Sequence, residues 1–161
     1  MADPIDDRIQ PCFFDRLIDE NPESQIDSRA NRAISLKRYR DGVLRDIAWL
    51  LNANRKVDEE NITEFGEAAR SVLNYGIPDL CGRISASLKL DEVEREISAA
   101  IVEFEPRIIP NTLSVRAIVE SKKSGPNVIA FEIRGELWAN PVSEQLYIKT
   151  QIDLDTGQCV V

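Results

Sequence analysis

The sequence contains no histidine. This absence excludes serine–histidine triads, cysteine–histidine dyads, and zinc or haem held by imidazole, and it removes the commonest general base of enzymes. Cysteine is scarce as well. Cys12, Cys81 and Cys159 are an odd number without CxxC spacing, which fits neither a disulfide framework nor a zinc site. We therefore expect buried thiols in a reducing compartment, with no metal and no cofactor.

Long apolar runs are also missing. No stretch approaches the roughly 18 apolar residues that a membrane span needs, and the first eight residues carry three aspartates and no apolar signal core. The chain has 28 acidic and 20 basic residues, a formal net charge of −8, which opposes non-specific attraction to phosphate. We expect a cytoplasmic soluble protein with no membrane span and no nucleic-acid partner.

Sequence motifs of common active sites are absent. The seven glycines are scattered and form no GxxxxGK, GxGxxG or GxSxG pattern. Carboxylates are the remaining acid–base candidates, and Glu103 and Glu105 stand out. Side chains two residues apart on a helix diverge by about 200°, whereas a glycosidase needs two carboxyl groups roughly 5–9.5 Å apart. The pair cannot share a cleft unless the helix has already ended, so we predict no enzymatic activity and no catalytic residue.

The organisation of the chain is predicted from its length and its prolines. A length of 161 residues suits one domain, since domains typically run to about 100–200 residues. Prolines at 4, 11 and 22 break a polar first part, so we predict an arm at residues 1–33 and one domain at residues 34–161. The arm's apolar residues must be covered by its own domain or by another chain, and both alternatives stay open. The candidate docking residues of the arm are Phe13, Phe14, Arg16 and Leu17.

Three helices are expected before residue 106. Ser35 is a plausible N-cap for a helix that runs to Leu51 with apolar residues at three-and-four spacing. A shorter helix at 64–73 should end at Asn74-Tyr75-Gly76, where glycine can take a positive φ. Asp91 and Glu94 suggest a capping box for a third helix, which Pro106 must stop at Glu105. The region from 29 to 45 is locally basic and is either a solvated face or a docking surface for an acidic partner.

After Pro110 the apolar period changes to two. Alternating segments at 113–119, 129–137 and 146–154 predict three strands with short connections, which should form an antiparallel meander with one apolar face. The apolar stripe of the third helix is the natural cover for that face. The predicted fold class is α+β, with N-terminal helices followed by a helix packed on a C-terminal three-stranded antiparallel meander.

Glu105-Pro106-Arg107 is the most informative polar motif. Proline fixes the exit from the helix, and arginine presents a planar fork suited to bidentate recognition of a carboxylate. The motif is a candidate interface pin. Alternatively, Arg107 only favours the negative end of the helix or pairs with a neighbouring acid.

Several stretches together resemble the phage-tail-lysozyme-like baseplate wedge proteins and, within that family, the type VI secretion baseplate components called TssE. The order of the stretches along the chain agrees with that family. They are Phe14-Asp15-Arg16-Leu17, Asp46-Ile47-Ala48-Trp49-Leu50-Leu51-Asn52, Ser71-Val72-Leu73-Asn74-Tyr75-Gly76-Ile77-Pro78-Asp79-Leu80, Ile101-Val102-Glu103-Phe104-Glu105-Pro106-Arg107, Gly135, Asn140-Pro141 and Leu154-Asp155-Thr156-Gly157.

The resemblance implies a structural baseplate subunit that seeds polymerisation of a contractile sheath, assembled at the inner face of the cell envelope. It implies that Glu105, Pro106 and Arg107 anchor the chain to the wedge core-bundle subunits. It also implies that the C-terminal sheet accepts strands from sheath subunits. Two rival functions are a peptidoglycan hydrolase with Glu103 or Glu105 as acid, and a small acidic adaptor that docks through the arm around Phe13 and Phe14.

Overall fold

The computed structural model describes residues 9, 11–18, 22–23, 34–55, 64–83, 88–118, 127–139 and 143–161. Most of the predicted arm lies outside these residues, as do Arg29 and Arg32 of the basic region and the Asn140-Pro141 break. The division into an arm at 1–33 and a domain at 34–161 therefore stays a prediction.

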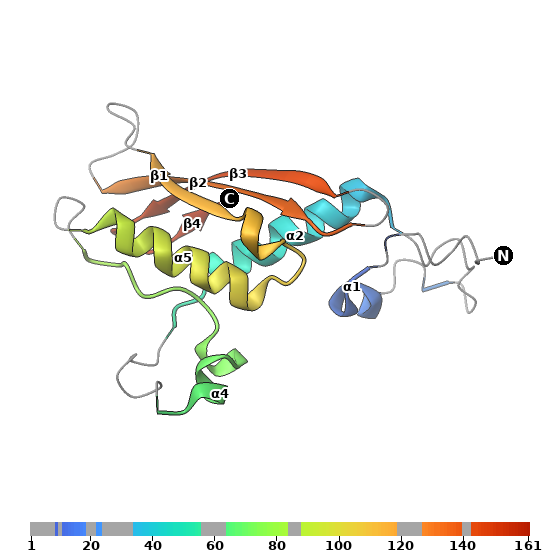
Figure 1. The fold of residues 1–161 in the computed structure, drawn as a ribbon, viewed down its shortest axis with the longest axis horizontal. Coiled ribbons are helices and arrows are strands. Elements are labelled where there is room, and N and C mark those ends of the chain that lie inside the picture. Colours follow the sequence, from blue (N-terminus) through green and yellow to red (C-terminus); the bar gives the residue numbers. More distant parts are fainter. Residues whose placement is uncertain are drawn as a thin grey trace.

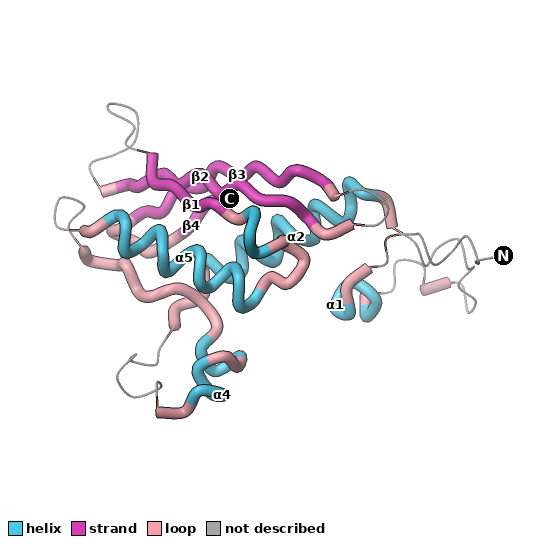
Figure 2. Tube along the Cα trace, in the orientation of Figure 1, coloured by secondary structure: helices cyan, strands magenta, loops and turns pink. Residues whose placement is uncertain are grey.

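The helices precede the strands, which confirms the α+β class (Figure 1). The sheet forms one layer, and α2 and α5 lie together on one side of it (Figure 2). The helical elements are α1 Phe13–Leu17, α2 Leu36–Leu51, α4 Gly66–Ala69, the 3-10 turn η2 Val72–Asn74, α5 Leu90–Phe104 and the 3-10 turn η4 Pro110–Thr112. The strands are β1 Ser114–Ile118, β2 Val128–Leu137, β3 Glu144–Asp153 and β4 Cys159–Val160.

The two long helices agree closely with their predicted spans. Ser35 caps α2 through its hydroxyl oxygen, which accepts a hydrogen bond from the Arg38 backbone amide at 3.2 Å. The start of α5 differs from the prediction: the N-cap is Lys89, without a side-chain cap. The capping box fails because the Glu94 carboxylate turns to the sheet and accepts a hydrogen bond from the Ala117 amide. At its other end α5 stops at Phe104, as Pro106 requires.

The helix predicted at 64–73 is mostly wrong. Only the four residues of α4 are α-helical, and the chain then turns into η2. Ser71 explains the interruption, because its hydroxyl donates to the Ala68 carbonyl at 2.8 Å and accepts from the Leu73 amide at 3.2 Å. Such local bonds compete with helical ones. The positive φ expected at Gly76 is confirmed at +118°.

The sheet is an antiparallel meander in the order β1-β2-β3-β4. Burial alternates along β3, where Leu146, Ile148 and Ile152 are buried between exposed neighbours, which confirms one apolar and one solvated face. The fourth strand was not predicted. It has two residues, too few to show an alternation of apolar and polar side chains, and it pairs only with Gln151 and Ile152.

The core lies between the sheet and the two long helices. Val93, Ile97 and Ile101 of α5 are buried in one cluster with Phe131 and Ile133 of β2, as the predicted packing of this helix requires. Helix α2 shares the cover, because Tyr39, Val43, Ile47, Leu50 and Leu51 belong to the same cluster. At the far end of α2, Asn52 Oδ1 accepts from the Cys159 amide at 2.9 Å and so joins α2 to β4.

The cysteines only partly follow the prediction of buried thiols. Cys159 is buried, where its thiol lies 2.8 Å from the Thr150 hydroxyl. Cys12 is half-buried, and Cys81 is exposed, so the prediction is wrong for Cys81. The exposed Cys81 thiol donates a hydrogen bond to the Asp155 carbonyl, in the loop after β3, at 3.3 Å.

Candidate functional site

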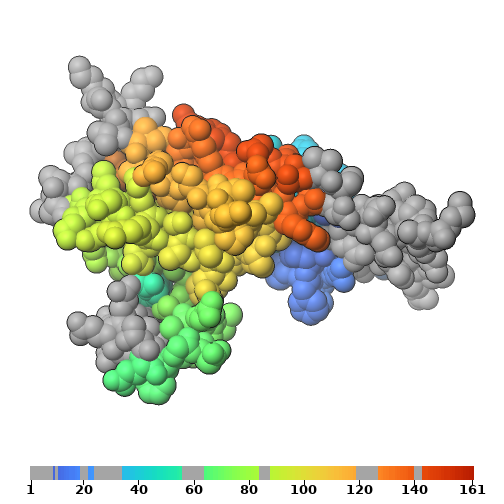
Figure 3. All heavy atoms as spheres, in the orientation of Figure 1, coloured from blue at the N-terminus to red at the C-terminus, as the bar shows by residue number. Residues whose placement is uncertain are grey.

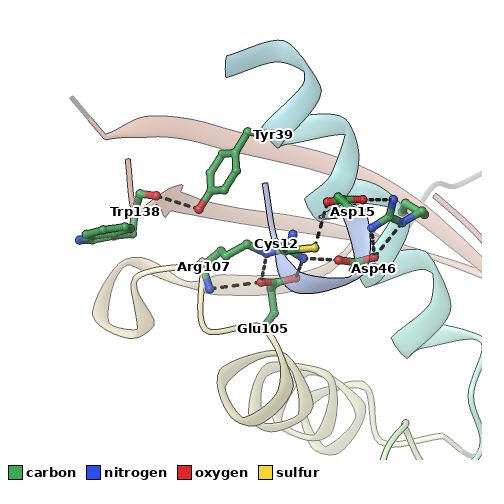
Figure 4. Close-up of polar contacts among 8 residues, drawn as sticks. Cys12, Asp15, Tyr39, Asp46, Glu105, Arg107 and Trp138 are labelled. Carbon is green, nitrogen blue, oxygen red and sulfur yellow. Dashed lines mark hydrogen bonds and ion pairs between the residues drawn. The ribbon is translucent and has the colours of Figure 1, made fainter. Parts of the chain in front are cut away.

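Three elements meet where the chain leaves α5. The backbone after Pro106 runs beside the end of β2: the Trp138 amide donates to the Arg107 carbonyl at 2.7 Å, and an antiparallel bridge joins Ile108 to Leu137. The Tyr39 hydroxyl of α2 donates to the Trp138 carbonyl at 2.9 Å (Figure 4). The Arg107 backbone is thus fixed by β2, which in turn is tied to α2.

The Arg107 side chain forms ion pairs within the chain. Its Nε donates to Glu105 Oε1 at 2.6 Å, and its Nη2 contacts both Glu105 Oε2 and Asp46 Oδ2 (Figure 4). The Glu105 side chain is 4% exposed and that of Arg107 16% exposed, whereas Pro106 is exposed. Within the single chain, Arg107 therefore pairs with neighbouring acids, which was one of the alternatives predicted for it. The anchor role of Glu105, Pro106 and Arg107 stays a prediction.

Burial and the neighbouring carboxylates shift the pKa of Arg107 in opposite directions. Burial lowers the pKa of the guanidinium, but its bonds to Glu105 and Asp46 outweigh that effect, so the net shift of the pKa is upward. Burial likewise raises the pKa of Tyr75, and the nearby carboxylates of Asp46 and Glu105 raise it further. The Tyr75 ring itself packs edge to face on Phe104 at the end of α5, with centroids 5.2 Å apart.

The ion pairs continue from α5 to α1 as a row of alternating sign. Asp46 also pairs with Arg45 at 2.8 Å, and Arg45 Nη1 pairs with Asp15 Oδ1 of α1 at 2.6 Å. Burial raises the pKa of Asp15, but the bonds from Arg45 and Cys12 outweigh it, and the net shift is downward. We call these five residues the ion-pair row: Asp15, Arg45, Asp46, Arg107 and Glu105.

The candidate docking residues of the arm are separated by the structure. The Phe14 ring meets the Trp49 ring edge to face with centroids 5.5 Å apart, so α2 covers part of this phenylalanine, which stays 47% exposed. The Arg16 Nε donates back to the Pro11 carbonyl at 3.1 Å. Phe13 and Leu17 are 77% and 66% exposed. Phe14 thus contacts its own domain, whereas Phe13 and Leu17 remain available to another chain.

Sequence reasoning missed Asp15, Arg45 and Asp46 as parts of the site. One signal existed for Asp46. It follows Tyr39 and Val43 at the same three-and-four spacing and precedes Leu50 by four, so it lies on the buried face of α2. A charge at such a position needs a partner inside the fold. Arg45 belongs to the basic region from 29 to 45, for which the sequence left a docking surface open as an alternative, whereas Asp15 gave no comparable signal.

Glu103 and Glu105 have separate partners. Glu103 pairs with the exposed Arg70 at 3.3 Å, and Glu105 is occupied by Arg107. Among the described residues no group of three acidic, cysteine or histidine side chains is placed to hold a metal ion. The same residues contain no helix with the length and apolarity of a membrane span.

The two borders of the sheet differ. On the β1 border the Glu94 carboxylate of α5 already accepts from the Ala117 amide at 2.8 Å. On the other border β4 pairs only with Gln151 and Ile152. Among the described strands, no other strand pairs with this outer side of β3, whereas β2 pairs with its inner side. The chain therefore offers a longer open border at β3 than at β1.

Comparison with known proteins decides the family. A family model described as baseplate wedge protein gp25 matches residues 37–142. The chain belongs to the baseplate wedge protein gp25 family. The match confirms the resemblance found in the sequence, and it includes Asp46 and the Glu105-Pro106-Arg107 motif. Neither the curated proteins nor the solved structures gave a match. Members of the gp25 family have a structural role in a baseplate, where they assemble with other baseplate subunits.

Proposed function

We propose that this chain is a structural wedge subunit of a contractile type VI secretion machine, and that it anchors the sheath and seeds its polymerisation by β-strand addition. Family membership supports the baseplate role. The observation that carries the sheath role is the open border of β3. The machine's architecture would place the chain on the cytoplasmic side of the envelope, at its inner face.

The open border of β3 presents backbone groups in a regular series. Asp153 directs its amide to the Gln158 carbonyl and its carbonyl to the Gly157 amide, so its backbone faces the β4 border. Backbone direction alternates along a strand, so Gln145, Tyr147 and Lys149 face that border too. Their side chains are exposed on the solvated face. An incoming strand gains main-chain bonds there without displacing any part of the core.

The wedge anchor is proposed to be Glu105, Pro106 and Arg107. Pro106 is exposed and precedes Arg107 in the chain, and the ion pairs hold the guanidinium in one orientation before a partner arrives. A preorganised group loses little conformational freedom on binding. We further propose that Phe13 and Leu17 contact another wedge subunit, because they are the most exposed large apolar side chains in the described part of the arm.

A proline at position 147 tests the sheath role. Tyr147→Pro removes an amide hydrogen from the open border, and proline is tolerated where the amide of an edge strand faces outward. We expect the variant to fold and to enter the wedge but to lose sheath extension. Sheath length on purified baseplates, measured by electron microscopy, gives the result.

Tyr147→Ala is the matched control, since it removes the side chain and keeps the amide. It should support sheath assembly as the unchanged chain does. Normal sheaths on Tyr147→Pro baseplates would refute strand addition at β3.

The hydrolase alternative has its own test. The Glu105 carboxylate is bound by Arg107 through both oxygens and Glu103 pairs elsewhere, so no two carboxylates of this motif face a common substrate. We expect purified protein to release no soluble glycan from cell-wall sacculi. Turnover that disappears in Glu105→Gln would overturn this expectation and favour the peptidoglycan hydrolase.

A further inference from the structure

Helix α1 is attached to α2 by one carboxylate and one ring. Asp15 pairs with Arg45 Nη1 at 2.6 Å, and the Arg45 guanidinium carbon lies 5.2 Å from the centre of the Phe14 ring and 5.0 Å from that of Trp49. Phe14 and Trp49 complete the contact edge to face. The guanidinium is thus shared between an aromatic residue and a carboxylate that are adjacent in the sequence.

This attachment is shallow. None of the residues of α1 is buried, and α1 stands out from the body of the molecule in the space-filling view (Figure 3). A helix of five residues is too short to be stable by itself in water. The segment before it is held at Ile9, whose carbonyl accepts from the Ile34 amide at 3.0 Å. The place of α1 itself on α2 depends on the few contacts of Phe14 and Asp15. Exposed contacts of this kind are individually weak, so another segment with the same groups can compete for them.

The surface beneath α1 places a guanidinium beside an indole. Arg45 and Trp49 are four residues apart on α2, so their side chains are neighbours on one face of the helix. They remain 30% and 50% exposed even with α1 in place. A guanidinium beside an indole recognises a ligand that brings a carboxylate and an aromatic ring together.

We propose that Arg45 and Trp49 form a docking site for a peptide segment in which an aromatic residue is followed by a carboxylate. The chain's own Phe14-Asp15 pair fills this site in the free subunit and acts as a built-in competitor. A partner segment of the same chemistry displaces it during assembly. That this partner belongs to the wedge rests on the proposed function; the docking site itself does not.

The ion-pair row explains why the ligand must be acidic. Arg45 contacts Asp46 Oδ1, and Asp46 Oδ2 contacts Arg107. A displacing segment without a carboxylate would leave Arg45 with Asp46 alone, whereas an acidic segment restores the alternation of charge. Asp46 thus connects the docking site at Arg45 to Arg107 of the proposed wedge anchor.

The test is peptide binding to the full chain. The probe is a fluorescent peptide with the sequence of residues 9–18, and the readout is anisotropy. In Phe14→Ala/Asp15→Asn the internal competitor is disabled, so we expect this variant to bind the peptide at least about tenfold more tightly than the unchanged chain, in which the site is mostly occupied.

Two further variants locate the binding. Adding Arg45→Gln or Trp49→Ala to the competitor-disabled chain should abolish the gain, and adding Arg95→Gln, which removes an exposed ion pair on α5, should leave it unchanged. Circular dichroism verifies that each variant is folded. Equal affinity of the unchanged and competitor-disabled chains, or no binding by either at millimolar peptide, overturns the proposal. Neither outcome affects the sheath test at Tyr147, so the two proposals fail separately.

Discussion

Replacing Arg107 by alanine is expected to lower the free energy of unfolding by about 3–5 kcal/mol, the usual cost of removing one partner of a buried ion pair. The reason is Glu105, whose side chain is 4% exposed and would lose the guanidinium that binds both of its oxygens. Urea unfolding followed by circular dichroism measures the change, which should appear in the midpoint and not in the slope.

The matched control is Arg95→Ala. The Arg95–Asp91 pair has side chains that are 73% and 78% exposed, and exposed pairs are worth at most about 1 kcal/mol. An Arg107→Ala midpoint equal to that of the unchanged chain would contradict the account of the ion-pair row.

The double variant Glu105→Gln/Arg107→Met separates stability from assembly. It removes both charges at once, and such replacements are often neutral for stability. We expect a chain close to the unchanged one in its unfolding midpoint that nevertheless fails to co-purify with wedge subunits, because the guanidinium is gone. Normal co-purification of the double variant would exclude Arg107 as the anchor.

The predictable part of this fold is the part encoded by local repetition. The spans of α2 and α5 and the strands β1, β2 and β3 follow from the apolar periods of their sequences. The segments that were missed are short. The two residues of β4 contain no period, and Ser71 breaks the expected second helix through hydrogen bonds that spacing does not reveal.

The sequence predicted the part of the site whose residues are close in the chain, but not the part that joins distant segments. Glu105 and Arg107 are neighbours in sequence, so their pairing was among the alternatives. Asp46 is 61 residues from Arg107, and Asp15 is 30 from Arg45. These contacts depend on how α1, α2 and the exit of α5 converge, which tertiary packing decides and no local pattern reports.

Gly76→Ala is expected to be the most damaging alanine substitution among the glycines that the structure describes. Gly76 has a φ of +118°, and a Cβ added there would lie 2.2 Å from the Ala53 carbonyl oxygen. That oxygen accepts from the Ile77 amide at 2.9 Å, and the Ile77 carbonyl accepts from the Arg55 amide at 2.8 Å. The two backbones must separate, so we expect a loss of about 3–5 kcal/mol from a strained φ and two lost hydrogen bonds at about 1 kcal/mol each.

Two other glycines divide this effect into its causes. Gly82 has a φ of +74° with no atom within 4 Å of an added Cβ, so Gly82→Ala isolates the conformational cost of roughly 1–2 kcal/mol. Gly66 has equal space and no positive φ, so Gly66→Ala should be neutral or stabilising by up to about 1 kcal/mol. Urea midpoints should therefore rank Gly66→Ala above Gly82→Ala and Gly82→Ala above Gly76→Ala. Equal midpoints for the last two would mean that the approach of residues 53–55 to Gly76 and Ile77 contributes nothing, although a parallel bridge pairs Asn54 with Ile77 there.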